Sequence, residues 1–147
     1  MLDVLYGVEF NDLNVRFYRR LDGLIATLNL VLGSAAAATL IAKLPGLAGW
    51  SGLAIAVLSA IQKTVNPADK ALKCAEHRAK YGDLAGRAAE MSLAGVDKEL
   101  RALQATGPDT IAALAIPAYN ANLRSNGYEA HVIHPVPILS RVACLLA

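Results

Sequence analysis

The forty residues from Gly23 to Gln62 contain a single charged side chain, Lys43. The second half of this stretch, from Leu47 to Ile61, is apolar all round and has no face suited to water. A helix of this kind is stable only where lipid or neighbouring protein excludes water. The chain has 147 residues, enough for one domain with a core of its own. What covers the apolar stretch is therefore the main question that the sequence raises.

The overall composition hides this division. Hydrophobic residues make up 55% and charged residues 18% of the chain, against roughly 45–50% and about 25% in an average globular domain. The excess lies in the apolar stretch, and the rest of the chain has an ordinary composition. A net charge of +2 with only 5% aromatic residues predicts no nucleic-acid partner, since neither a basic patch nor a stacking platform is available.

No motif predicts catalysis or a cofactor. The sequence contains no GxSxG, HExxH, P-loop or dinucleotide-binding fingerprint, so we expect a protein that is not an enzyme and binds no cofactor. Glu129, His131 and His134 lie within six residues, but in an extended segment the two histidines fall on opposite faces, so we predict no metal site. Cys74 and Cys144 form no CxxC and are expected to be reduced and buried.

Breakers along the chain predict an all-α fold. Pro45 and Gly46 end one helix, "VNPAD" starts another at Pro67, and Gly107 with Pro108 ends that one. The alternation of prolines with branched residues after Tyr128 predicts an extended tail. The helical pattern begins at residue 10. We predict a helical domain over 1–127 followed by an extended tail over 128–147. The segments predicted within the domain are apolar spans at about 23–44 and 46–65, a long amphipathic helix at about 67–105 and a short helix at about 108–126.

The long predicted helix has an apolar heptad seam opposite a charged face. The charged face places acids four residues before bases, as in Asp83 and Arg87, which favours a solvated surface. Small residues in the middle of the seam permit close approach of a partner helix. This pattern predicts a homo-oligomer. The predicted seam residues are Ala75, Ala79, Gly82, Gly86, Ala89, Leu93, Val96 and Leu100.

One interpretation of the apolar stretch is a two-span membrane hairpin. A bilayer core of about 30 Å needs roughly 20 apolar residues, and 23–42 meets that length. Lys and Arg flank the two ends of the stretch while the turn has Lys43 alone, which predicts that both termini lie in the cytoplasm. The flanking basic residues are Arg16, Arg19, Arg20 and Lys63, and the polar residues within the first span are Asn29, Ser34 and Thr39.

A second interpretation explains the same composition without lipid. In it the chain is a soluble or particle-embedded structural protein, such as a phage component, and neighbouring subunits bury the apolar helices. The alanines of the first span are nearly neutral for membrane insertion, and its polar residues interrupt it. Both interpretations require the chain to associate with copies of itself.

Three segments resemble the SLATT family, in the order expected for it. These are "VRFYRRLDGLIATLNLVLG", then "NPADKALKCAEHRAKYGDL" with His77, Tyr81 and Leu84 as its "H…Y..L" element, and then "LAIPAYNANL". The resemblance covers Arg16 to Leu123. It implies a two-transmembrane effector of a bacterial or phage conflict system, located in the bacterial inner membrane, that forms pores or perturbs the membrane. It also implies a lipid bilayer and a separate sensor protein as partners.

Overall fold

The computed structural model describes residues 2–34, 45–128 and 133–147, without the side chains of 45–49 and 51. The described residues form helices, turns and connectors and contain no strand, which confirms the predicted all-α class. The helices are α1 (Leu2–Leu32), α3 (Pro45–Val65), α4 (Pro67–Arg87), α5 (Leu93–Ala105), α6 (Ala115–Ser125) and α7 (Ile138–Leu145), with short 3-10 turns η1 (Ala88–Glu90) and η2 (Ala112–Leu114).

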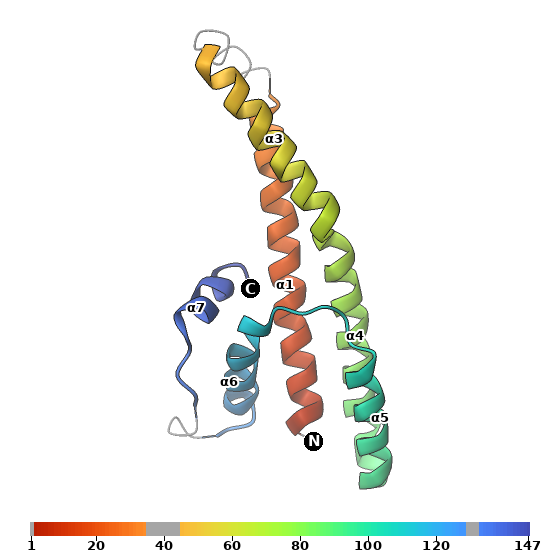
Figure 1. Cartoon of the computed structure of the whole chain (residues 1–147). Helices are drawn as coiled ribbons and strands as arrows, with labels where there is room; N and C mark the ends of the chain where they lie inside the picture. Colours follow the sequence, from red (N-terminus) through yellow and green to blue (C-terminus); the bar gives the residue numbers. More distant parts are fainter. Residues whose placement is uncertain (1, 35–44, 129–132) are drawn as a thin grey trace.

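The long helix α1 organises the molecule (Figure 1). Its first two thirds are flanked by α4 on one side and by α6 and α7 on the other. We call this part, with α5, the body. The rest of α1, from Gly23 to Leu32, lies beside α3 and projects from the body. We call these two segments the arm.

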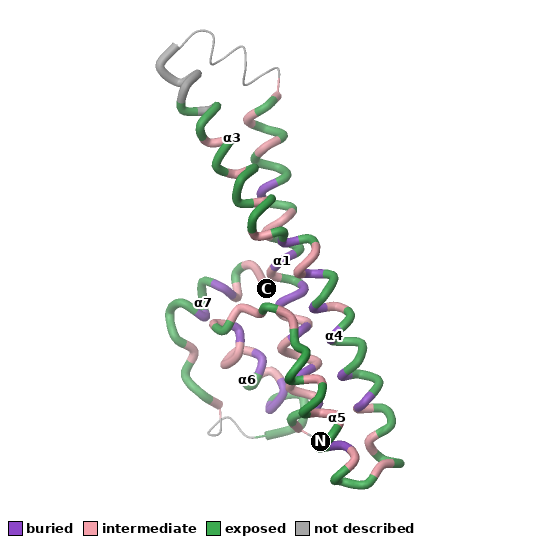
Figure 2. The backbone as a smooth tube through the Cα atoms, turned by 45° about the vertical axis from the view of Figure 1, so that its right-hand side comes forward, coloured by how far each residue is buried: buried purple, intermediate pink, exposed green. Residues whose placement is uncertain are grey.

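The core of the body lies where α1 packs against α4. The buried residues of α4 follow one another at intervals of three or four and form a single stripe facing α1. Two clusters result, and burial is concentrated in the body while the arm is largely exposed (Figure 2). One cluster contains Val4, Tyr81, Leu84 and Val96, and the other contains Val15, Tyr18, Ala71 and Cys74.

Gly7 is the point of closest approach between α1 and α4. A Cβ atom built on Gly7 would lie 2.4 Å from ring carbons of Tyr81, closer than atoms can pack. The Tyr81 ring is buried among Val4, Leu84 and Val96 and cannot move aside easily. The absence of a side chain at residue 7 therefore sets the distance between the two helices.

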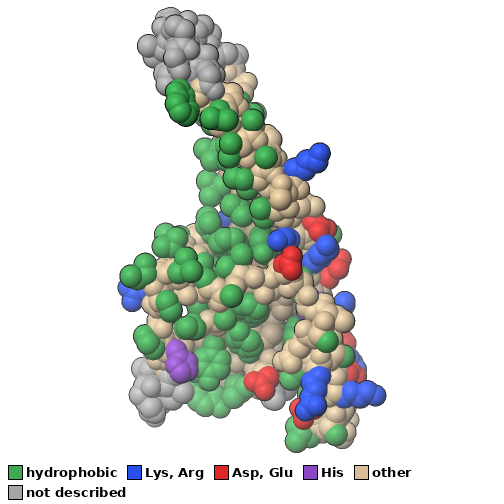
Figure 3. Space-filling view, viewed as in Figure 1, with side chains coloured by type: hydrophobic (Ala, Val, Ile, Leu, Met, Phe, Trp, Pro, Cys, Tyr) green, Lys and Arg blue, Asp and Glu red, His purple; other side chains and the backbone are tan. Residues whose placement is uncertain are grey.

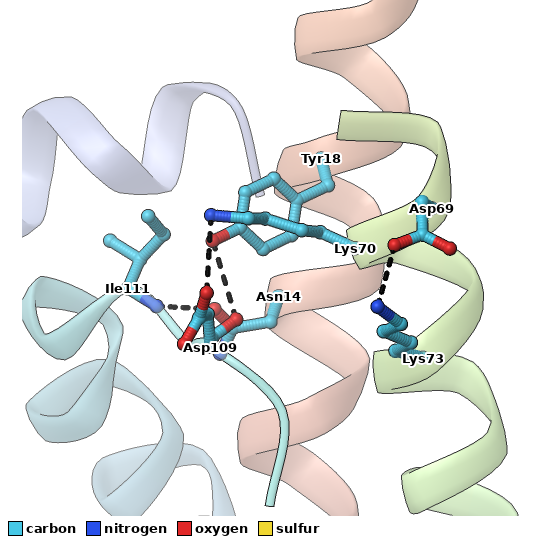
Figure 4. Close-up of polar contacts among 7 residues, drawn as sticks. All are labelled: Asn14, Tyr18, Asp69, Lys70, Lys73, Asp109 and Ile111. Carbon is cyan, nitrogen blue, oxygen red and sulfur yellow. Dashed lines mark hydrogen bonds and ion pairs between the residues drawn. The ribbon is translucent and has the colours of Figure 1, made fainter. Parts of the chain in front are cut away.

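A polar cluster fastens the connector between α5 and α6 across α1 and α4 (Figure 4). Asn14 Oδ1 accepts a hydrogen bond of 2.7 Å from the backbone N–H of Ile111. The Tyr18 hydroxyl donates to the Asp109 carbonyl at 3.4 Å, and the Asp109 carboxylate lies 3.5 Å from Lys70 Nζ. Lys70 also lies over the Tyr18 ring, 5.8 Å from its centroid. The connector is thus held by main-chain and side-chain contacts together.

Asparagines hold the C-terminal part of the chain. The Asn120 amide donates to the His134 carbonyl at 2.8 Å and accepts from the His134 N–H at 3.0 Å, as a strand neighbour would. The Asn122 amide donates to the Leu2 carbonyl at 3.0 Å, which joins α6 to the start of α1. Both asparagines are buried, so these bonds are shielded from water.

Two predicted helices have other bounds in the structure. The predicted helix over 67–105 is interrupted after Arg87, because Ser92 caps a new helix by accepting a bond of 3.2 Å from the Gly95 N–H. The α5 helix then folds back on α4, with an ion pair of 3.0 Å between Arg87 and Glu99. The helix predicted over 108–126 starts later, at η2 and α6.

The two ends of the chain also differ from expectation. The first helix begins at Leu2 rather than near residue 10, because Val4 and Gly7 pack against α4. The tail predicted to be extended over 128–147 contains α7, which begins directly after Pro137. Proline before a helix is compatible with its start, since it breaks no helical hydrogen bond there.

The lengths and compositions of the helices contradict the membrane interpretation. None of the helices in the described part of the chain combines the length and the apolar character needed to cross a bilayer. In α1 only the ten residues from Gly23 belong to the apolar stretch, and the rest forms the body. The predicted transmembrane spans and inner-membrane localisation are therefore wrong, although 35–44 of the first predicted span lie outside the described residues. The predicted lipid partner stays untested.

Alanine at Gly7 should destabilise the fold. The added methyl group overlaps the Tyr81 ring, so we expect the free energy of unfolding to fall by roughly 1–3 kcal/mol in urea denaturation. The matched control is Gly82→Ala in α4, where the new Cβ meets nothing within 4 Å and helix propensity improves by about 1 kcal/mol. Equal stability of the two variants would contradict the close approach.

The two thiols should differ in reactivity. Cys74 is fully buried, and burial raises the pKa of its thiol to about 11. Burial also raises the pKa of the half-buried Cys144. Because the thiolate is the reactive form, we expect alkylation of the native protein at pH 8 to be at least about tenfold slower at Cys74 than at Cys144. Mass spectrometry after denaturation should show both thiols reacting at similar rates.

Candidate assembly surface

The arm exposes large apolar side chains along both of its helices. Trp50 is 70% exposed and Leu30 is 74% exposed. Charged side chains gather over α4 and α5 in Figure 3, whereas hydrophobic side chains cover the arm and the side of α6 and α7. The exposed large apolar residues of the arm are Leu24, Leu28, Leu30, Val31, Trp50, Leu53, Val57 and Ile61.

The backbone at Asn66 sets the direction of the arm. Asn66 separates α3 from α4 and has φ 45° and ψ 61°, the left-handed conformation. Asparagine adopts this conformation more readily than other non-glycine residues. The next residue, Pro67, is buried and starts α4, as predicted, although the Asn66 side chain makes no capping hydrogen bond. The chain therefore turns at one residue and keeps α3 against the end of α1.

The base of the arm has a polar contact of its own. Gln62 Nε2 donates to Asp22 Oδ1 at 3.4 Å and joins α3 to α1.

The basic residues predicted to flank a membrane have different surroundings. Arg16 pairs at 2.5 Å with Asp12, which also binds Arg78 of α4. Arg20 donates to the Leu145 carbonyl at 3.4 Å, so it contacts the C-terminal helix. The remaining two, Arg19 and Lys63, are exposed.

The polar residues predicted to lie within the first span are not brought together as a lumen. Asn29 is half-buried in the arm, and its Oδ1 has no hydrogen-bond partner among the described residues. The Ser34 hydroxyl donates to the Val31 carbonyl at 2.9 Å. Thr39 lies outside the described residues.

The predicted heptad seam is divided between two surfaces. Of its central residues, Ala79, Gly82 and Gly86 are exposed on α4 and Ala89 is exposed in η1. Neither glycine has a neighbour within 4 Å of its Cβ position. Beyond the break at η1 the seam no longer continues along one helix.

The other seam residues have separate positions. Val96 is buried in the core cluster and Leu100 packs against it, so both serve the fold of the chain itself. Ala75 packs against the second cluster, and Leu93 is 77% exposed on α5.

Sequence reasoning missed a second apolar face, on α7. Four of its large apolar residues are exposed at a helical spacing: Ile138, Leu139, Val142 and Leu145. The sequence "ILSRVACL" has this helical spacing, but the prolines that precede it predict an extended segment. Since α7 contacts α1, this face adds apolar surface on the same side of the molecule (Figure 3).

The chain exposes more surface than a compact monomer of its mass. Its accessible surface is 9261 Å², whereas a globular monomer of 15.4 kDa exposes roughly 7,200 Å². The excess is about 2,000 Å², and a standard protein interface buries only about 800 Å² on each partner. The exposed apolar side chains of the arm contribute to this surface.

No cluster suited to a metal ion occurs in the described part of the chain. Glu129 and His131 lie outside the described residues. His134 is held by Asn120 through its backbone, and its ring lies 5.4 Å from that of Tyr119.

Comparison with protein-family models, with curated proteins and with solved structures finds no match for this chain. The resemblance to the SLATT family therefore stays a prediction.

Substitution of Asn66 should test the turn at the base of the arm. Because the Asn66 side chain is exposed and makes no capping bond, Asn66→Ala mainly adds the left-handed backbone cost of about 1 kcal/mol to the folded state. Asn66→Gly relieves that cost and should be at least as stable as the unchanged protein in urea denaturation. An alanine variant as stable as the glycine variant would show that residue 66 does not adopt this conformation.

Proposed function

We propose that the protein is a non-enzymatic structural subunit of a homo-oligomer, in which copies of the chain cover one another's apolar arms. The observation that supports this proposal best is the exposure of eight large apolar side chains on the arm. Contiguous apolar patches of more than a few hundred Å² are rare on monomers and mark interaction surfaces.

The chemistry of the arm favours a second copy as the partner. Between Gly23 and Leu32, and again between Trp50 and Gln62, the sequence contains no charged residue. A two-fold interface brings the same surface together from both subunits, so uncharged apolar surfaces are self-complementary where charged ones repel. Interfaces of permanent homo-oligomers are also the most apolar and exceed 2,000 Å² in total. The excess surface of this chain is sufficient for such an interface.

Two copies paired through their arms would form a bundle of four helices. In that arrangement each α3 finds a neighbour on the face that α1 leaves open. Asn29 Oδ1, which has no partner among the described residues, would meet a hydrogen-bond donor from the other copy. The exposed small-residue face of α4 supplies a second surface through which such units would associate further, in a helical assembly or a particle.

The experiment is sedimentation velocity over a range of protein concentrations, with Trp50 as an internal probe. Trp50 is the single tryptophan of the sequence and lies on the arm. We expect a mass above that of the monomer, and a blue shift of tryptophan emission with loss of quenching by acrylamide as the oligomer forms. The double variant Leu53→Glu/Val57→Glu buries two carboxylates in the interface, which should weaken association more than about a hundredfold.

The matched control is Leu93→Glu, which places the same side chain on an exposed leucine of α5, outside the arm. Its association should equal that of the unchanged protein. Gly82→Leu/Gly86→Leu should leave the arm-paired unit intact and remove only higher assemblies. A monomer with quenchable Trp50 at all concentrations, or equal masses for the arm variant and the Leu93 control, would refute the proposal.

A further inference from the structure

A cavity of about 290 Å³ lies in the body, away from the arm. It is lined by residues of α1 and α4, by Gln104 near the end of α5, and by the connector that follows α5. Its lining includes three aromatic residues, Tyr6, Phe10 and Tyr81, and two buried polar residues, Asn11 and His77. The volume is sufficient for a small planar molecule of about ten heavy atoms.

Both buried polar residues present an unpaired atom. Asn11 is 4% exposed, and its amide donates to the Gly7 carbonyl at 2.8 Å, so Oδ1 is left as an acceptor without a partner among the described residues. His77 is 5% exposed, and Nε2 likewise has no partner there. Buried polar atoms without partners destabilise a fold by about 1–3 kcal/mol each, so their presence at one cavity indicates an occupant.

The surroundings of His77 indicate whether Nε2 donates or accepts a hydrogen bond. Because Nε2 has no partner among the described residues, we assign the contact of His77 with the Thr106 backbone to the other ring nitrogen, Nδ1, as the donor. Burial, with a smaller contribution from Lys80, lowers the pKa of His77, so the ring is neutral at pH 7. In that tautomer Nε2 has a lone pair and accepts a hydrogen bond. Asn11 Oδ1 and His77 Nε2 therefore offer two acceptors to the N–H or O–H groups of an occupant, and the side chains of Gln104 and Thr110 in the lining can donate or accept.

The remaining lining favours a positive charge. Aromatic faces attract cations, and the Tyr6 and Phe10 rings are stacked 5.7 Å apart and nearly parallel. Asp3, which is exposed, places a carboxylate at the mouth. Among the described residues that line the cavity there is no Lys or Arg.

We infer that this cavity binds a small organic cation of the amidinium or guanidinium class, with Asn11 and His77 as its hydrogen-bond acceptors. A planar cation of this class has N–H groups pointing in several directions and a flat face that stacks on aromatic rings. The site is independent of the arm, so its failure would leave the proposed assembly untouched.

The probe is benzamidinium, titrated into the full-length protein by calorimetry and by NMR of the side-chain amide of Asn11. Benzamide is the neutral isostere, in which an oxygen replaces one nitrogen. We expect saturable binding of benzamidinium at one site per chain and at least about tenfold weaker binding of benzamide. Asp3→Asn, at an exposed position, should weaken benzamidinium binding by about two- to fivefold without changing the melting temperature.

The acceptor residues are tested by Asn11→Leu and His77→Phe, each expected to weaken benzamidinium binding at least about tenfold, which corresponds to about 1.4 kcal/mol. The matched control is Asn29→Leu, which removes the unpaired amide oxygen of the arm and should leave binding unchanged. If His77→Phe does not fold, Asn11→Leu and Asp3→Asn still decide the question. No saturable binding, equal binding of benzamide, equal binding by Asn11→Leu, or ordered water alone in the cavity would each overturn the inference.

Discussion

The contact between α1 and α4 is the constraint on which the rest of the structure depends. It requires a residue without a side chain at Gly7, because the Tyr81 ring occupies the space that a Cβ would need. Both core clusters lie along this contact, and the connector to α6 is hydrogen-bonded across it by Asn14. With α1 and α4 fixed in this way, α6 and α7 are left to cover the other side of α1.

The arm follows from the same contact. The α1 helix is longer than the body, and α4 begins only after the left-handed turn at Asn66. The apolar end of α1 and the whole of α3 therefore extend beyond the residues that could bury them. Burial of apolar surface is the dominant favourable term in folding and in association, so surface that the chain cannot cover itself favours association. Burial of apolar surface thus drives both the folding of the body and the proposed assembly through the arm.

Much of the fold could be predicted from residue patterns, and the failures have identifiable causes. Pro67 marks the start of α4 because proline fits the first turn of a helix and not its interior. The break at η1 was missed because the heptad pattern continues through it, and only the packing of Val96 on Val4 and Leu84 shows that α5 folds back. The buried stripe of α4 passes through Cys74, His77 and Tyr81, one step from the predicted seam. Tyr18 of α1 packs with Cys74, and Gly7 leaves room for the Tyr81 ring. The cavity could not be predicted, since its lining comes from segments about a hundred residues apart.

The sequence by itself determined that the chain is helical and that several of its helices begin or end near particular prolines and glycines. It also determined that forty nearly uncharged residues must be covered from water. These properties follow from local backbone preferences and from composition, which neighbouring residues alone define. Only the tertiary structure decided which face of α4 is buried, that α5 reverses direction, that Asn11 and His77 meet at one cavity, and that no described helix suits a bilayer. Those outcomes depend on shape complementarity between distant segments, such as Gly7 against Tyr81. Local sequence patterns carry no information on how such distant segments fit together.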